Sequence, residues 1–365
     1  MKSVMREMIC ALSLVGVSVL CTLALLQPSQ VHLQPAPSVP RSVHLINSTL
    51  TIALLGSTYS HFGNGSQMWA WQAQLAECNQ SCSLVDAGLP YDPIANKIAS
   101  EADVWLVEGN HYTRDWLNQS YLYGRHKRRP GQLAAVLAME PHQYAAYQDP
   151  KWRVSIDALI AYNTHADIRE IYSCWLHRKI LAAGPRPAFA TKKPRVAVFV
   201  SNCLEPRNHT LHLLAREFPV DSFGKCAHNA DASAAPPPFE GSSKQAVMSQ
   251  YMFGFAFENL QLSEYVSEKV LDALYAGSIP VYSGAPEVGY FLPSPNAIVN
   301  YNDFESVPEL ARFMADIARN ETLYNSFFDW DLKAYKNRVI DQHCATPFIC
   351  TLCSEAHVRK RGGNA

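Results

Sequence analysis

Short apolar runs recur along this chain, and stretches of helix length separate them. Runs of this kind are typical of strands buried on both faces, and strands that alternate with helices form parallel sheets. With 365 residues, the chain is long enough for two domains of about 150 residues each. The sequence therefore predicts an α/β protein with two parallel sheets, whose strands we expect at 51–56, 103–109, 132–140 and 154–162, and at 195–201, 253–259, 279–284 and 297–301.

The amino-terminal region has the pattern of a membrane anchor. Residues 9–26 form an uncharged run of 18, preceded by Lys2 and Arg6, and a membrane-spanning helix needs about 20 apolar residues. A cleaved signal peptide is the alternative, but its apolar core is usually shorter and an A-x-A site normally follows it. We expect a cytosolic tail at 1–8, an uncleaved signal anchor at 9–26 and a proline-rich stem at 27–47. The basic tail then places the rest of the chain in the lumen.

Glycosylation signals agree with that placement. Asparagine heads an N-x-Ser/Thr triplet at Asn47, Asn64, Asn79, Asn118, Asn208 and Asn320. All lie beyond the predicted anchor, where a secretory-pathway protein is modified. Asn208 is set aside because its neighbour Arg207 is proposed below to contact a ligand. The formal net charge of -1 gives no field that would attract nucleic acid.

The cysteines favour disulfides. Of the ten cysteines, Cys10 and Cys21 lie in the predicted anchor, which leaves eight in the lumenal part, and an even lumenal set is typical of disulfide-bonded proteins. The C-x-x-x-C and C-x-x-C pairs near the two ends would also suit half a zinc site or a redox pair, although neither context is evident. Spacing alone does not give the connectivity.

The segment 253–286 indicates the chemistry. An apolar run is followed by a polar loop and then by a helix pattern that starts at Ser267, a capping residue, and ends at Gly277. Glu268 and Lys269 therefore lie in the first helical turn, where the helix dipole favours anions over a lysine. A phosphate would resolve this conflict, and the carboxylate would accept hydrogen bonds from sugar hydroxyls. A solvated Glu–Lys pair is the alternative.

The amino-acid sequence of this segment and of several others resembles that of the α1,3-fucosyltransferases, most of all the plant-type core enzymes. The similar blocks are FAFEN, YVSEK and AGSIPVYSGAP within 255–286, VSNCLEPRNHTLHLL at 200–214, DSFGKC at 221–226, PGQLAAVLAMEPHQYAAY at 130–147 and YNTHADI at 162–168. Together they cover about 130–304, with a weaker echo in the CTLC at 350–353. Several blocks occur in the same order, so chance agreement is improbable.

The resemblance implies a GT-B arrangement: two facing Rossmann-like domains with a central cleft. We expect an acceptor-side domain at 48–185, a GDP-fucose-binding domain at 194–343 and a C-terminal tail at 344–365. The implied enzyme is an inverting glycosyltransferase of the Golgi membrane, single-pass type II, that moves L-fucose from GDP-fucose to a GlcNAc hydroxyl in α1,3 linkage.

The acceptor stays open among three alternatives. The core GlcNAc of N-glycans on a glycoprotein is favoured, while a Lewis-type antennal acceptor and a protein hydroxyl remain as alternatives. A non-catalytic binder of glycan or GDP-fucose is the alternative from a different class.

The resemblance also assigns roles to single residues. Glu140, which ends the apolar run at 132–140, is the expected catalytic base, with His142 as second choice. The expected donor-binding residues are Arg207, Asn259, Tyr265, Glu268 and Lys269. Glu258 is equally well explained as a buried acid that orders its loop. By the same resemblance, Cys78, Cys82, Cys350 and Cys353 tie the chain ends together, and Cys203 pairs with Cys226.

Catalysis is not expected to require a metal. The chain has one D-x-D motif, at 329–331, far from the expected phosphate site, and we interpret it as structural. No cofactor is expected besides the donor substrate, and manganese would act only as a stimulant that screens product GDP. The aromatic side chains of 251–257 are expected to pack in the core rather than to stack on guanine.

Overall fold

The computed structural model describes residues 49–55, 66–88, 93–109, 128–141, 147–154, 156–183, 188–232 and 242–362. The predicted tail, anchor and stem at 1–8, 9–26 and 27–47 lie outside these residues, as do His142 and three of the predicted glycosylation sites: Asn47, Asn64 and Asn118. Within the described ranges no helix combines the length and the apolar character that a membrane crossing needs.

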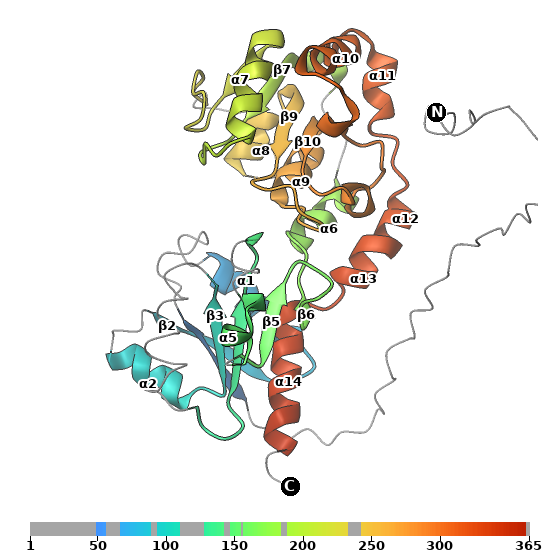
Figure 1. Ribbon diagram of the computed structural model, residues 1–365. Helices are drawn as coiled ribbons and strands as arrows, with labels where there is room; N and C mark the ends of the chain where they lie inside the picture. Colours follow the sequence, from blue (N-terminus) through green and yellow to red (C-terminus); the bar gives the residue numbers. More distant parts are fainter. Residues whose placement is uncertain are drawn as a thin grey trace, which may run out of the picture. The chain divides into compact units, whose positions relative to one another are not determined.

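Two parallel sheets form the framework, as predicted (Figure 1). The first has the strand order β2-β1-β3-β4-β5-β6, and all its pairs are parallel. Its strands are β1 (Leu50–Leu55), β2 (Cys82–Gly88), β3 (Val104–Glu108), β4 (Leu133–Leu137), β5 (Ala158–Ala161) and β6 (Ile168–Arg169).

The second sheet is also entirely parallel, in the order β8-β7-β9-β10-β11. Its strands are β7 (Lys193–Val198), β8 (Val220–Ser222), β9 (Tyr251–Phe257), β10 (Ile279–Ser283) and β11 (Val299–Asn300). In both sheets the chain adds a second strand on one side of the first and then continues on the other side. The strand order therefore reverses at β1/β3 and at β7/β9, and ligands of open parallel sheets bind at such points, beyond the carboxyl ends of the strands.

All eight predicted strands are present, but several boundaries differ. The strand predicted at 132–140 ends at Leu137, three residues before Glu140. The strand predicted at 154–162 begins only at Ala158. Val154 directly follows a short helix and is 80% exposed, so it is not part of the buried strand. Sequence analysis missed β2, β6 and β8. These strands are short or carry polar residues, so they lack the continuous apolar run that marks the others.

Helices cover both faces of each sheet. The helices of the first half are α1 (Ser66–Ala76), α2 (Pro93–Glu101), α5 (Pro150–Arg153) and α6 (Cys174–Ala182). Those of the second half are α7 (Arg207–Glu217), α8 (Ser243–Met248), α9 (Glu268–Tyr275), α10 (Val307–Arg319), α11 (Glu321–Ser326), α12 (Leu332–Tyr335), α13 (Asp341–His343) and α14 (Phe348–Gly362). Short 3-10 turns lie at Phe189–Thr191, Val288–Phe291 and Tyr301–Asp303, and a π-helical turn spans Lys336–Ile340.

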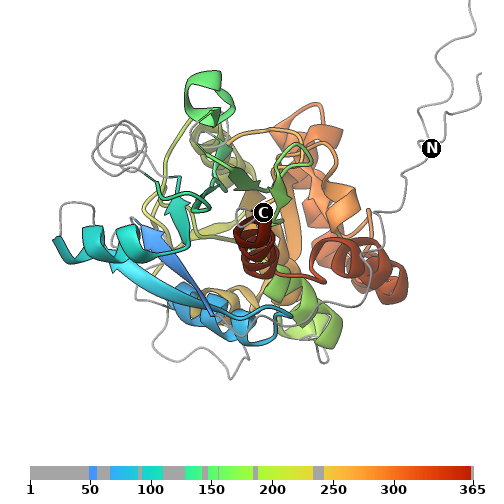
Figure 2. The same cartoon turned by 90° about the horizontal axis from the view of Figure 1, so that it is seen from below.

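The alternation of side chains along β1 shows how the first sheet is buried. Leu50, Ile52 and Leu54 share a core with α1 and with the last helix, α14, whereas Ala53 and Leu55 pack on the opposite face with α2. Successive strand residues point to opposite faces, so both faces of the sheet are closed. Figures 1 and 2 show α14 lying along this first sheet, although 170 residues or more separate it from β6 in sequence.

The second sheet is covered in the same way. One face of β7 packs with α7 and α10, and the other packs with α8 and α9. Helix α9 also shares a core with α6, which precedes this sheet in the chain. The predicted domain limits at 48–185, 194–343 and 344–365 stay a prediction, since α6 and α14 each pack with a core outside their own predicted range.

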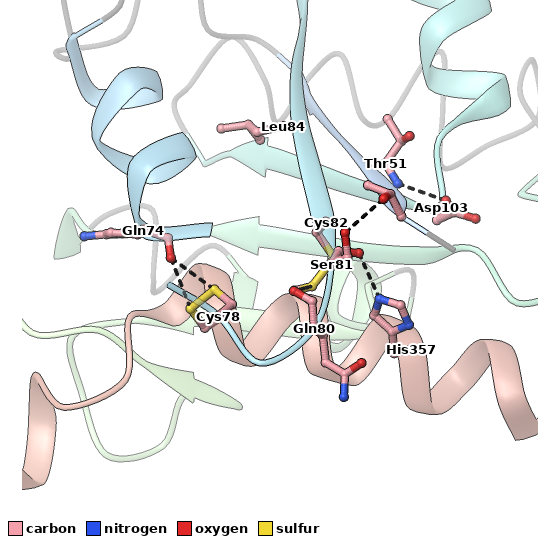
Figure 3. The surroundings of a disulfide bond; sticks show 12 residues. Thr51, Gln74, Cys78, Gln80, Ser81, Cys82, Leu84, Asp103 and His357 are labelled. Carbon is pink, nitrogen blue, oxygen red and sulfur yellow. Dashed lines mark hydrogen bonds between the residues drawn. A yellow bond between two sulfur atoms is a disulfide. The ribbon is translucent and has the colours of Figure 1, made fainter. Parts of the chain in front are cut away.

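Within the described residues, four disulfides are present. Cys78 is bonded to Cys350 and Cys82 to Cys353, which ties the start of the first sheet to α14 (Figure 3). Cys203 is bonded to Cys226. A fourth bridge, Cys174 to Cys344, links α6 to the end of α13 and was not foreseen from the sequence. The disulfides expected from the even cysteine count are therefore present.

Replacing both Cys350 and Cys353 with alanine is expected to lower the free energy of unfolding by about 5 kcal/mol, because each bridge closes a very long loop. The matched control, Cys203→Ala with Cys226→Ala, opens a bridge of sequence separation 23 rather than 272 and should cost about 3 kcal/mol on the same entropic argument. Denaturant unfolding under non-reducing conditions measures both. Equal losses would contradict the dependence on loop length, and an unchanged free energy of unfolding in the Cys350/Cys353 variant would show that packing alone holds α14 to the sheet.

Candidate functional site

Arg207 links two loops at the point where the second sheet reverses its strand order. It is the first residue of α7 and is 5% exposed. Its guanidinium donates to Asn259 Oδ1 at 2.5 Å, to the carbonyl of Phe257 at 3.3 Å and to the carbonyl of Asn202. One nitrogen, Nε, is buried without a hydrogen-bond partner among the described residues. The planar fork thus fastens the loop after β7 to the loop after β9.

The Glu258 carboxylate lies at the amino end of α9. Its side chain is fully buried and accepts hydrogen bonds from Ser267 N at 2.8 Å and from Ser267 Oγ at 2.6 Å. Ser267 is the N-cap residue of α9, as predicted. Its hydroxyl donates to Glu258 and accepts no hydrogen bond from a helix amide, so the predicted capping bond is absent. Glu258 places a carboxyl group at the end of the helix where the dipole favours negative charge. It is a buried acid that orders its loop, as considered from the sequence.

Lys269 extends this cluster toward solvent. Its Nζ lies 2.8 Å from Ser267 Oγ, 3.4 Å from Glu258 Oε2 and 3.5 Å from Glu268 Oε1, and its side chain is 20% exposed. Burial opposes the charge on this lysine, but the carboxylates of Glu258, Glu268 and Glu140 outweigh burial and raise its pKa. Lys269 is therefore a fixed cation at the opening turn of α9.

The two acids beside Lys269 differ in their surroundings. Burial raises the pKa of Glu258, and Lys269 and Ser267 offset only part of that rise. Burial also opposes the charge on Glu268, but Lys269 and Lys244 outweigh it and lower the pKa of Glu268. The Glu268 side chain is 42% exposed. Glu268 is thus an ionised, accessible acceptor, whereas Glu258 is an internal one.

Glu140 reaches this cluster from the first sheet. Both sheets lie in one compact unit, and the Tyr265 hydroxyl donates a hydrogen bond of 2.9 Å to Glu140 Oε2. Tyr172 donates from its hydroxyl to the carbonyl of Met139, the preceding residue. One tyrosine therefore holds the carboxylate of Glu140, and another holds the backbone that carries it.

Tyr265 is enclosed by other rings. It is 0% exposed, and its ring centroid lies 5.3 Å from that of Tyr162 and 5.7 Å from that of Tyr172. Burial, reinforced by Glu140, raises the pKa of the Tyr265 hydroxyl, so the phenol stays protonated and donates to the carboxylate. Tyr265 was predicted to line a donor pocket, but its bond to Glu140 was not predicted. Tyr172 was not predicted as a site residue, because β6, the strand before it, is too short to be recognised from an apolar pattern.

The structure thus brings four of the six predicted site residues into one chain of contacts or electrostatic interactions: Glu140, Tyr265, Glu268 and Lys269. Asn259 is bonded to Arg207, and Arg207 joins the four through its electrostatic interactions with Glu258 and Tyr265. Burial lowers the pKa of Arg207, and those two groups offset part of the shift. An arginine so placed remains a cation.

Other predicted features have structural roles. Asp331 caps α12 by accepting from Ala334 N at 2.9 Å, and Trp330 Nε1 donates to the carbonyl of Phe327 at 2.8 Å. The aromatic side chains of β9 pack in the core, as predicted. Of the glycosylation sites within the described ranges, Asn79 and Asn320 are exposed, and Asn320 also caps α11.

One group of metal-ligand types occurs among the described residues: Cys82, Cys353 and His357. The two sulfurs are bonded to each other, so they are not the thiolates that bind a metal. His357 Nε2 lies 3.0 Å from the carbonyl of Ser81 (Figure 3). This cluster supports the sheet and α14 and gives no metal centre.

Gly284 allows the close approach behind Glu258. A methyl group on Gly284 would lie 2.3 Å from the hydroxyl oxygen of Tyr282 and 2.6 Å from Glu258 Cγ. Gly284→Ala is therefore expected to destabilise the protein by about 1–3 kcal/mol, as other overpacking substitutions do. In the control, Gly289→Ala, the nearest atom lies at 3.5 Å, an ordinary contact. Thermal denaturation compares the two, and equal melting temperatures would contradict tight packing at Glu258.

Comparisons with known proteins bear on this site. Residues 189–363 match the model of "Glycosyltransferase family 10 (fucosyltransferase) C-term". A fucosyltransferase-like protein of Arabidopsis thaliana is 28% identical over 235 residues, which are 62% of this chain and 43% of that protein. GDP-fucose protein O-fucosyltransferase 3 of Xenopus tropicalis is 34% identical over 142 residues, 38% of this chain and 30% of that protein. The chain spans less than half the length of the curated relatives it matches.

Solved structures share the fold. An α1,3-fucosyltransferase crystallised with GDP-fucose superposes with a TM-score of 0.53 at 17% identity, covering 87% of this chain and 94% of that chain. A structure of an α1,3-fucosyltransferase with GDP superposes with a TM-score of 0.54 at 18% identity and the same coverage. At these identities the likeness shows the fold alone.

Proposed function

We propose that the protein transfers L-fucose from GDP-fucose to a hydroxyl group, and the premise is the match of residues 189–363 to the C-terminal model of glycosyltransferase family 10, the fucosyltransferases. The observation that carries the proposal is the contact between the two halves of the site. Glu140, which follows a strand of the first sheet, accepts a hydrogen bond from Tyr265. Tyr265 comes four residues before the cation Lys269, which lies in the first turn of α9 beside the second sheet.

In the proposed reaction the acceptor oxygen attacks C1 of fucose while the bond from C1 to the β-phosphate oxygen of GDP breaks. Glu140 accepts the proton of the attacking hydroxyl, and GDP leaves with the bonding electron pair. A single displacement of this kind inverts the anomeric centre, so the β-linked donor gives an α-linked product. The hydrogen bond from Tyr265 holds the Glu140 carboxylate in place through Oε2.

On the donor side, Lys269 would offset the negative charge that develops on the diphosphate as the bond breaks. The accessible carboxylate of Glu268 would accept hydrogen bonds from ribose or fucose hydroxyls. Arg207 keeps the loops after β7 and β9 together through Asn202, Phe257 and Asn259. These loops lie at the reversal point of the sheet, where nucleotides bind in related topologies.

We propose an N-glycan GlcNAc as the acceptor, in α1,3 linkage and with the core residue favoured, because the blocks at 221–226, 283–296 and 350–353 resemble the plant-type core enzymes. A second candidate, a serine or threonine hydroxyl of a protein, is supported by the relatives named GDP-fucose protein O-fucosyltransferase 3. Placement as a type II protein of the Golgi membrane rests on the apolar run at 9–26 and the exposed glycosylation signals. A non-catalytic binder has no need of a held base beside a fixed cation.

The test uses a soluble fragment from Val43 with GDP-fucose and three acceptor sets: core N-glycans, N-acetyllactosamine glycans and folded proteins with exposed serine or threonine. Release of GDP that depends on one set, with the linkage assigned by NMR and mass spectrometry, identifies the acceptor. Parallel reactions with EDTA and with manganese test the expectation that no metal is required. Tight binding of GDP without transfer to any set would favour the binder.

A further inference from the structure

Glu264, which precedes Tyr265, has an unusual backbone. Its φ of 61° lies in the left-handed region, which costs a residue with a side chain roughly 1–3 kcal/mol and persists only where the surroundings impose it. The neighbouring amides are tied locally, since Tyr265 N donates to Leu262 O at 3.2 Å and Val266 N donates to Glu264 O at 3.0 Å. The loop thus turns sharply just before the tyrosine that holds Glu140.

The Glu264 side chain explains what imposes this turn. It crosses to the first sheet's loops, where Oε2 accepts from Thr164 N at 2.8 Å and from Thr164 Oγ1 at 3.1 Å, and Oε1 accepts from Arg169 at 2.9 Å. Both charged side chains are about one-fifth exposed, so the ion pair is shielded from water more than a surface pair is. Three hydrogen bonds therefore hold one carboxylate between the two halves of the molecule.

Arg169 is itself held on several sides. Its Nε donates to the Tyr162 carbonyl at 3.2 Å, and its guanidinium carbon lies 5.9 Å from the centroid of the Phe291 ring. Its NH1 group lies 3.3 Å from His343 Nδ1. Burial, with help from Arg169, lowers the pKa of His343 to about 4, so the neutral ring accepts this proton and its Nε2–H faces the Tyr290 hydroxyl at 2.9 Å.

We propose that Glu264 and Arg169 are positioning residues for catalysis: their ion pair sets the turn that places the Tyr265 hydroxyl on Glu140. This inference rests on the proposed transfer reaction. Arg169 also bonds the backbone carbonyl of Tyr162, whose ring packs on Tyr265. Neither Glu264 nor Arg169 touches the reacting atoms in this scheme, and both act through the Tyr265–Glu140 contact. Glu264 and Arg169 are not among the proposed donor-binding residues, although Glu264 is next to Tyr265 in sequence.

The first test is Glu264→Gly, which permits the positive φ but removes the ion pair. We expect kcat to fall about 10- to 100-fold, because a displacement of the base by about 1 Å has an effect of that size, while the Kd for GDP stays within about twofold. Arg169→Gln breaks the same pair from the other side and should give a similar loss. Arg153→Gln, which breaks the Arg153–Asp167 pair of the first sheet, is the control and should retain the wild-type kcat.

A double-mutant cycle separates positioning from a general structural role. If Glu264 acts through Tyr265, adding Glu264→Gly to Tyr265→Phe should lower kcat by no more than about twofold beyond Tyr265→Phe alone. Multiplied losses, or a GDP affinity that falls together with kcat, would overturn the proposal. Retention of wild-type kcat by both Glu264→Gly and Arg169→Gln would also overturn it.

Amide hydrogen exchange gives a readout that needs no activity. In Glu264→Gly and Arg169→Gln, the amides of Tyr265 and Val266 should exchange faster than in the wild type, and those of Arg153→Gln should not. Wild-type exchange rates in both variants would show that the Glu264–Arg169 ion pair does not hold this turn. If the wild-type protein transfers fucose to no acceptor but exchange is faster in the two variants, the proposed function is rejected, and the ion pair still holds the turn. The exchange data also show whether each variant is folded.

Discussion

Glu140→Gln is expected to lower kcat for fucosyl transfer by about 10²- to 10⁴-fold, the range that general acid–base groups contribute. Glutamine keeps the size of the side chain and an oxygen that accepts the Tyr265 hydrogen bond, but it has no carboxylate to take the acceptor proton. The affinity for GDP should change little, because glutamine keeps the bond to Tyr265 and Lys269 keeps its closer carboxylate partners, Glu258 and Glu268. Initial rates and calorimetric titration with GDP measure the two effects.

The matched control is Glu305→Gln, an exposed acid before α10, which should transfer fucose at the wild-type rate. Thermal denaturation shows whether Glu140→Gln retains its fold. Substantial transfer by a folded Glu140→Gln protein would remove Glu140 from the role of base. Weaker GDP binding at an unchanged kcat would reassign it to the donor site.

Lys269→Met is expected to weaken GDP binding about 10- to 100-fold, since a hydrogen bond to a charged group contributes about 1.5–3 kcal/mol and each 1.4 kcal/mol is tenfold. The variant should also be less stable, because burial raises the pKa of Glu258, Lys269 offsets part of that rise, and its removal takes away the ion-pair partner of a buried acid. Titration with GDP and a denaturation curve measure both effects.

Lys336→Met is the control for Lys269→Met. Lys336 is 52% exposed and pairs with Asp341 on the surface, so GDP affinity and stability should both stay near the wild-type values. Arg207→Lys tests the other cation: it keeps the charge but loses the fork that joins Asn202, Phe257 and Asn259, and it should also weaken GDP binding. Wild-type affinity in both Lys269→Met and Arg207→Lys would remove the second-sheet loops from the nucleotide site.

Local patterns predicted the parts of the fold that depend on neighbours in sequence. The apolar run at 253–259 was identified as a strand, and the helix between Ser267 and Gly277 was placed within one or two residues. Gly277 has the expected positive φ of 69°. These features follow from side-chain periodicity and from glycine's freedom to adopt a left-handed backbone, and both are written into a few adjacent residues.

The site shows where such reasoning stops. Glu140 and Lys269 were both named from the motifs, but the bond from Tyr265 to Glu140 joins residues that are 125 positions apart. The role of Ser267 was also misjudged, because the competing acceptor, Glu258, comes from the preceding strand and lies in space beside the helix start. A cap is preferred only when no stronger partner is present, and tertiary contacts decide which partners are present.

By itself, the sequence determined that this chain forms parallel strands alternating with helices, that the Glu268–Lys269 pair opens a helix, and that cysteines would be paired. Only the tertiary structure decided the order of the strands, the partner of Cys174, the packing of α14 on the first sheet, and the Glu264–Arg169 ion pair that joins the two halves. The physical reason is range. Backbone preferences and side-chain periodicity act over a few residues, whereas these contacts join segments that only the folded chain brings together.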